Sequence, residues 1–426
     1  MAKLFAFEEM EIESPGENIE ISDDELDSVQ ELPVVQDENE EIGEHAEAID
    51  EAVDATGDLD EVREVVEKSI EEEGGLSPVA AEAVRIAVES ICARVGASPK
   101  SLFSLYATEN YKSSSARLAN SKLALEGIGE FIRNLWEKIK KAVKSLWDKL
   151  VAFWEKHFST LGRLSKTLNS LYDKVGSIKG KVEEKEVKAP SSLAKDYCWT
   201  NPVTAKVIKE TLSRHIEFIK KLGDFRKIAN ENNELLKNIA EKYATQEIYE
   251  KERQLRSLLE EVNKLSFGGE TEPLVTGVYY VVEAKEIKER TFKEYVSLFS
   301  IDKKVINKEV EDDVKFEVLT IEEMRELIKL GKEIVSKTMD MKKSIPDMKK
   351  SLNEVVDKMD KLVAKLESQE NVNNEDKDMY RAIVGVFSKL QSSYAKFAAG
   401  VVSLNTRAAN SIIIAVKTSA RMYKKS

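Results

Sequence analysis

The sequence predicts a mainly α-helical protein: long amphipathic helices in a bundle, a small antiparallel β insertion at about residues 274–319, and a disordered acidic N-terminal leader. Apolar residues recur every three or four positions over most of the chain after Leu59, which is the period of a helix with one buried face. The 426 residues include only 18 Gly and 8 Pro, too few for a turn-rich all-β fold. β-branched and aromatic residues concentrate in 274–319, which places the strands there.

The first 73 residues differ from the rest in charge. They hold 28 acidic and 3 basic residues, whereas residues 74–426 hold 50 acidic and 62 basic ones, although the whole chain carries −13. Residues 1–56 also have few aromatics and little apolar periodicity, which favours disorder. We therefore expect residues 1–73 to be an acidic, largely disordered leader or propeptide, able to mask a basic surface.

Residues 74–178 are expected to form an N-terminal helical region. Ser77 followed by Pro78 is typical of a helix start, and Gly96 of its end. Residues 107–121 are polar and suggest a loop or short helix. The stretch 132–158 then carries three of the four tryptophans on a continuous helical stripe. The stripe consists of Ile132, Leu135, Trp136, Ile139, Val143, Leu146, Trp147, Leu150, Trp154 and Phe158.

This tryptophan helix has two interpretations. Its apolar face and lysines suit a contact helix for DNA, lipid or a partner protein. The candidate contact residues are Trp136, Lys140, Lys141, Lys144, Trp147 and Trp154. The alternative is core packing, which we favour, because every neighbouring segment has the same period and needs a partner for its own stripe.

Residues 179–202 are expected to be a linker and residues 203–426 a second helical bundle with the β meander inside it. Thr320 and Glu323 predict a capping box at a helix start, and Pro346 predicts a break. The expected helices are 203–242, 244–265, 320–343, 347–369 and 379–423, and the expected strands are 274–284, 291–299 and 314–319. The loop 370–378 precedes the last helix, whose apolar stretch 394–423 suits a buried position better than a membrane.

The sequence contains no constellation typical of an enzyme. The only histidines are His45, His157 and His215, and no metal-binding, phosphate-binding or dinucleotide-binding motif is present. Cys198 and His215 are the one conceivable nucleophile and base, but their spacing matches no known signature. We expect no catalytic residue, no cofactor and no metal. No signal sequence or transmembrane span is expected either, because no uncharged apolar run approaches 18 residues.

Two stretches resemble internal head (virion structural) proteins of large tailed bacteriophages. They are "EEEGGLSPVAAEAVRIAVESICARVG" at 71–96 and "KLALEGIGEFIRNLWEKIKKAVKSLW" at 122–147, and the resemblance covers about residues 60–158. It implies a non-enzymatic structural protein of the phage head interior, packed with the genome. The implied partners are other virion head proteins and, without sequence preference, DNA; the implied locations are the virion and, during assembly, the host cytoplasm.

The resemblance also implies trimming by a prohead protease that cuts after glutamate. "IDEA", "ALEG" and "SQEN" place candidate cleavage sites after Glu51, Glu126 and Glu370. Loss of residues 1–51 would leave 64 basic and 59 acidic residues, and loss of 1–126 would leave 56 and 46. Either cut converts an acidic precursor into a basic product suited to DNA.

Two other functions are compatible with the pattern. An α-helical pore-forming or membrane-remodelling protein would use "LVTGVYYVV" (274–282) as its inserting element. A scaffolding protein would share the head assembly pathway and then leave the capsid.

Overall fold

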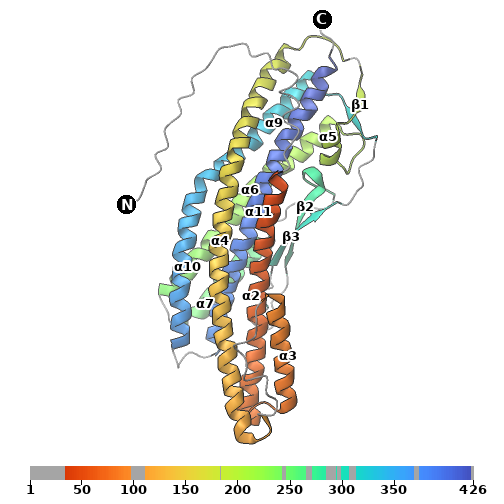
Figure 1. The fold of residues 1–426 in the computed structure, drawn as a ribbon. Coiled ribbons are helices and arrows are strands. Elements are labelled where there is room, and N and C mark those ends of the chain that lie inside the picture. Colours follow the sequence, from red (N-terminus) through yellow and green to blue (C-terminus); the bar gives the residue numbers. More distant parts are fainter. Residues whose placement is uncertain are drawn as a thin grey trace.

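The computed structural model describes residues 34–96, 111–182, 184–241, 246–264, 271–284, 294, 299–306, 313–368 and 374–423. Long helices run side by side along an elongated bundle, and small β elements lie against one flank (Figure 1). The helices are α2 (Val34–Glu73), α3 (Pro78–Arg94), α4 (Ser114–Ser177), α5 (Ser191–Asp196), α6 (Ala205–Glu241), α7 (Gln246–Lys264), α9 (Ile321–Asp340), α10 (Ile345–Ser368) and α11 (Asn374–Arg421). The strands are β1 (Glu186–Lys188), β2 (Val278–Ala284), β3 (Phe299–Val305) and β4 (Lys315–Glu317). The mainly α-helical prediction is confirmed.

The expectation of a disordered leader is wrong for residues 34–73. They form α2, a single 40-residue helix that packs against both α4 and α11 (Figure 1). Ile42, Ala46, Ile49 and Val53 recur every three or four residues, and all four are buried. The many acidic residues between these apolar positions suggested a solvated, disordered segment. In the fold, several of those carboxylates have basic partners instead. The expectation for residues 1–33 lies outside the described residues.

The helix starts predicted from capping residues are confirmed. The Ser77 side chain accepts a hydrogen bond from the backbone N–H of Ala80 at 3.1 Å, and Gly96 follows α3 with φ of +59°. Thr320 and Glu323 form the complete capping box of α9. Such caps satisfy backbone N–H groups that have no partner within the helix.

Helix α4 is longer than the sequence indicated. It has 64 residues, which at 1.5 Å per residue span about 96 Å. The tryptophan stretch, the segment 161–178 and the polar residues 114–121 therefore belong to one helix, capped by Ser113. Residues 114–121 look like a loop in isolation, but tertiary packing of Ser121 and Ala124, both fully buried, outweighs their weak helix preference.

The tryptophans of α4 are core residues. Trp136, Trp147 and Trp154 are 4%, 2% and 1% exposed, and the Trp147 ring stacks on Tyr394 of α11 with centroids 5.8 Å apart. The core-packing interpretation is confirmed. Helix α11 is the other half of this core, because its residues are buried on every side over most of its length.

One described helix, Arg381–Arg421 within α11, is long and apolar enough by composition to cross a membrane. The apolar window of that helix is 78% buried inside the bundle, as in a core helix. The expectation of a buried C-terminal helix is therefore confirmed, and the composition follows from its central position.

The structure differs from two predictions about the β elements. The expected linker contains a strand, and the three expected strands do not form one meander. Residues 179–202 contain β1 and α5, and β1 pairs antiparallel with β4, so that Val187 lies opposite Phe316. β4 is therefore not the third strand of a meander. β2 pairs antiparallel with β3 alone, with Val278 opposite Val305. The partner of β4 is set by the buried Phe316 ring, whose neighbours in the strand are exposed.

Other boundaries shift by a few residues. β3 begins at Phe299, where the expected strand 291–299 ended, and most of that segment lies outside the described residues. The break at Pro346 is confirmed, since a 3₁₀ turn (Met341–Ser344) separates α9 from α10. Helix α11 already includes residues 374–378 of the expected loop.

Replacement of Trp147 with alanine tests the tryptophan core. We expect Trp147→Ala to lower the free energy of unfolding by about 3–5 kcal/mol, because the remaining cavity lies against Tyr394. Urea unfolding followed by circular dichroism measures the change. Leu123→Ala, at a 52% exposed position of the same helix, is the control and should cost about 0.5 kcal/mol or less. Equal losses in the two variants would contradict the core assignment.

Candidate functional site: a charged seam between α2 and the core helices

The six predicted contact residues of α4 do not form one accessible surface. The three indole rings are buried, and Lys140 is 6% exposed and ion-paired to Glu137. Lys144 pairs with Asp357 of α10 at 3.1 Å, and Lys141 is exposed. The sequence grouped these residues by their spacing, but the fold distributes them between the core, two ion pairs and the solvent.

The clearest charged site is instead the seam where α2 lies against α11. We define the α2 seam as the acidic residues of α2 together with their partners on α11 and α4. The contacts to α11 are Asp60 with Arg381 at 2.7 Å, Asp54 with Lys389 at 2.8 Å, Asp50 with Ser392 at 2.6 Å and Glu47 with Lys396 at 2.7 Å. Residue numbers fall along α2 as they rise along α11, so the two helices pair antiparallel in one continuous register.

The seam extends to α4 at the N-terminal end of α2. The Lys149 ammonium pairs with Glu41 and also contacts the His45 ring. The hydrogen bond from Lys149 lowers the pKa of the Glu41 carboxyl, because it favours the ionised form. Helix α2 thus neutralises basic groups on both core helices.

The pairs in the seam differ in burial. Asp60 and Arg381 have side chains 6% and 20% exposed, whereas Glu47 is 64% exposed. The buried pair has more influence on stability, because a charge left alone in a low-dielectric setting is costly. The exposed pair is screened by water and contributes little.

Asp50 has an unusual environment within the seam. Burial raises the pKa of its carboxyl from 3.8 to about 7, although the hydrogen bond from Ser392 and the charge of Lys389 act in the opposite direction. The Asp50 carboxyl therefore holds a proton up to about neutral pH.

His215 is a structural residue in this fold. Its Nε2 accepts a hydrogen bond from the backbone N–H of Val275 at 3.2 Å, and Nδ1 lies 2.8 Å from the Asn405 side-chain oxygen. Burial lowers the pKa of the imidazole to about 4. Both ring nitrogens are engaged, so His215 is not placed to act as a base toward Cys198. No group of three or more potential metal ligands occurs among the described residues.

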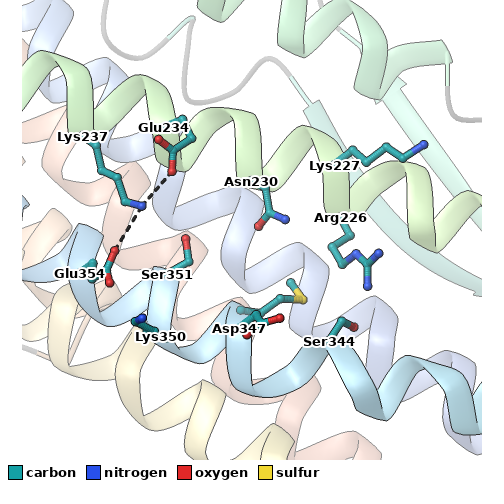
Figure 2. Close-up of a pocket in the computed structure, with 11 residues that line it drawn as sticks. Arg226, Lys227, Asn230, Glu234, Lys237, Ser344, Asp347, Lys350, Ser351 and Glu354 are labelled. Atoms are coloured by element: carbon teal, nitrogen blue, oxygen red, sulfur yellow. Dashed lines mark hydrogen bonds and ion pairs between the residues drawn. The ribbon is translucent and has the colours of Figure 1, made fainter.

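A polar pocket of about 530 Å³ lies between α6 and α10 (Figure 2). Four basic and three acidic side chains line it, and Lys237 bridges Glu234 at 2.8 Å and Glu354 at 3.3 Å. The charges largely cancel, and the lining contains neither histidine nor cysteine. This lining is suited to joining two helices rather than to acid–base chemistry.

Comparison with known families identifies the chain. A sequence model of the family described as phiKZ-like phage internal head proteins matches residues 34–417. The chain belongs to this family. No curated protein and no solved structure shows significant similarity to it. The match begins at the first residue of α2, so the acidic helix is part of the region that the family shares.

As an internal head protein, the chain is a structural component of the phage head interior. The resemblance noted over about residues 60–158 therefore extends over nearly all of the described fold. The sequence alone did not reveal the α2 seam. The sequence feature that could have indicated the seam is the spacing of Arg381, Lys389 and Lys396, which are eight and seven residues apart. This spacing places three basic groups on one face of a largely apolar helix.

The candidate cleavage sites of this internal head protein lie in different settings. Glu51 is exposed in the middle of α2, between the buried Ile49 and Val53. Glu126 is exposed on α4, and Glu370 lies outside the described residues. Cleavage at either described site requires local opening of a helix, since a protease needs an extended segment.

Removal of the buried carboxylate tests the energetics of the seam. We expect Asp60→Asn to lower the free energy of unfolding by about 3 kcal/mol, because Arg381 loses its partner in a largely buried position. Glu47→Gln removes an equal charge from the exposed pair and should cost less than about 1 kcal/mol. Urea titrations of the two variants provide the comparison, and a larger cost for Glu47→Gln would refute the ranking.

The Asp50 carboxyl predicts a pH dependence of stability. Between about pH 4 and pH 7 the unfolded chain releases this proton while the folded chain keeps it, so stability should fall as pH rises. Asp50→Asn cannot ionise, so its free energy of unfolding should not show this fall between about pH 4 and pH 7. Glu51→Gln, which removes a neighbouring exposed carboxylate, is the control for charge. An unchanged profile in Asp50→Asn would show that Asp50 does not titrate there.

Proposed function

We propose that this internal head protein is packed with the genome as a non-enzymatic structural component, and that its acidic helix keeps it in a closed form during assembly in the host cytoplasm. The family match over residues 34–417 carries this proposal. Its proposed partners are other virion head proteins and, without sequence preference, the packaged DNA. The described residues add no constellation that favours an enzymatic role.

The α2 seam supports a role for the acidic helix in control. Helix α2 holds 17 acidic and 2 basic residues, and several of its carboxylates pair with α4 and α11. While α2 is docked, these basic groups have intramolecular partners and are not available to another polyanion. The closed form is therefore the less basic one.

Trimming by a prohead protease would remove a smaller or larger part of the seam, depending on where the protease cuts. A cut after Glu51 would detach Glu41, Glu47 and Asp50 and so release their partners Lys149, Lys396 and Ser392. It would also uncover the apolar groove that Ile42, Ala46 and Ile49 fill. A cut after Glu126 would remove α2 and α3 entirely. Each product would expose basic and apolar groups together, as a protein joining a head assembly requires.

The pore-forming alternative would require core residues to leave the fold. Leu274, Val275, Val278 and Tyr280 of the candidate inserting element are all buried. Flotation with liposomes at high salt tests this alternative, since lipid insertion persists there whereas attraction of charges is screened.

Mass spectrometry of purified virions tests the proposed function. We expect the chain among virion proteins, with a new N-terminus at Ala52 or Gly127, or a C-terminal fragment beginning at Asn371. An uncleaved chain in virions would refute trimming but not the head-interior role. Presence in proheads with absence from mature virions would favour the scaffolding alternative, and absence from both would overturn the proposal.

A further inference from the structure

A cluster of three cations surrounds one aromatic ring where α4 packs against α9. The guanidinium carbon of Arg325 lies 5.3 Å from the centroid of the Tyr172 ring, and the ammonium groups of Lys329 and Lys332 lie 6.0 Å and 5.6 Å from it. We call these four residues the Tyr172 cluster. The ring attracts each cation through its negative face, by about 0.5–1 kcal/mol at an exposed site.

The cations of the cluster differ from many other basic side chains of the described residues in their lack of an ion pair. None of the three makes an ion pair with a carboxylate in the described part of the chain. Two nearby acids of α9 pair with other bases: Glu326 with Lys209 at 2.7 Å, and Glu333 with Lys337 at 3.2 Å. The charge of Lys329 also lowers the pKa of the Glu326 carboxyl, but by less than the hydrogen bond and the charge of Lys209 do.

The cluster lies at the protein surface, where a ligand can reach it. Arg325, Lys329 and Lys332 are all exposed, and the Tyr172 ring is half-buried beneath them. The α4 wall next to the ring carries Gly176, where an added Cβ would lie 2.7 Å from the Arg325 guanidinium. The glycine therefore lets the guanidinium lie directly against the helix.

Three like charges held around one ring repel one another, and among the described residues no carboxylate forms an ion pair with any of them. The polar pocket of Figure 2 shows the contrast, since Lys237 there lies between two glutamates. Along α9, residues 325 and 332 are about 10 Å apart at 1.5 Å per residue. Duplex DNA carries about one charge per 1.7 Å of axis, so a short length of backbone meets all three cations.

We propose that the Tyr172 cluster binds the phosphate backbone of duplex DNA. The three cations act as charge contacts without base readout, and Tyr172 holds them in place. These residues differ from the six that the sequence suggested, which lie between Trp136 and Trp154 in the middle of α4. This inference rests on the proposed function, because it assigns the contact between the head protein and the genome to specific side chains.

The steepness with which salt weakens binding tests the assignment. Fluorescence anisotropy of a labelled duplex with the full chain, from about 25 to about 150 mM NaCl, gives the slope of log Kd against log salt. We expect Arg325→Gln/Lys329→Gln/Lys332→Gln to bind more weakly at every salt concentration. Its slope should fall by about 2 to 3, since each phosphate contact contributes about 0.9.

A matched triple variant controls for total charge. Lys188→Gln/Lys343→Gln/Lys349→Gln removes the same charge from lysines that are already ion-paired to acids outside the cluster, so its slope should change by less than about 1. Circular dichroism confirms that both variants are folded. Equal slopes in the two variants, or no binding by the wild-type chain at low salt, would overturn the proposal.

Anionic phosphatidylglycerol vesicles form the second arm of the experiment. Binding to vesicles that depends on the cluster and exceeds binding to DNA would reject DNA as the ligand in favour of a lipid surface. These results are independent of the virion inventory. A chain found in virions with no effect of the cluster variant refutes only this site, whereas absence from virions refutes the proposed function itself.

Discussion

Helix α11 is buried along most of its length, and a helix that is apolar on every side requires a covering helix on every side. Helices α4, α6 and α9 cover three of its faces, and α2 covers the remaining one. That last face also carries Arg381, Lys389 and Lys396, so its cover must be both apolar and acidic. Helix α2 meets both demands. Much of the arrangement of the bundle follows from this requirement.

The pairing of α2 with α11 also explains the charge distribution of the chain. The acidic residues are not only a soluble leader, because several are neutralised by bases far away in the sequence. Apolar burial supplies most of the stabilisation in such an interface, and the ion pairs fix the register. The same contacts mean that any removal of α2 changes the surface in two ways at once. Basic groups lose their partners, and an apolar groove opens beside them.

The functional surfaces then divide along the bundle. The tryptophan segment of α4, residues 132–158, packs in the core with α2 and α11, and its lysines serve mainly as ion-pair partners. Farther along the same helix, Tyr172 packs against α9, where the three exposed cations form no ion pair within the described part of the chain. One long helix thus contributes to a closed structural seam and, separately, to an exposed basic cluster. The polar pocket between α6 and α10 is balanced in charge and joins those helices.

Local patterns were sufficient to predict most of the helices after α2, their caps and the burial of the tryptophans. Ser77 with Pro78, and Thr320 with Glu323, act within a single turn, so their neighbours in the sequence are also their neighbours in space. The stripe of α4 likewise has a period that a single sequence shows. The family resemblance was visible in two short stretches for the same reason.

Only the tertiary structure decided the state of the acidic segment, the partner of β4 and the location of the cation cluster. Asp60 and Arg381 lie 321 positions apart, and nothing local indicates that they meet. A charged residue appears solvated in a sequence unless its partner is known, so α2 resembled a disordered leader. The six residues proposed for α4 were grouped by periodicity, but burial and long-range pairing separated them. The sequence by itself determined most of the helices from Pro78 onward, because their apolar period and caps are local. The packing of the helices decided that the acidic segment is also a helix and which charges remain available.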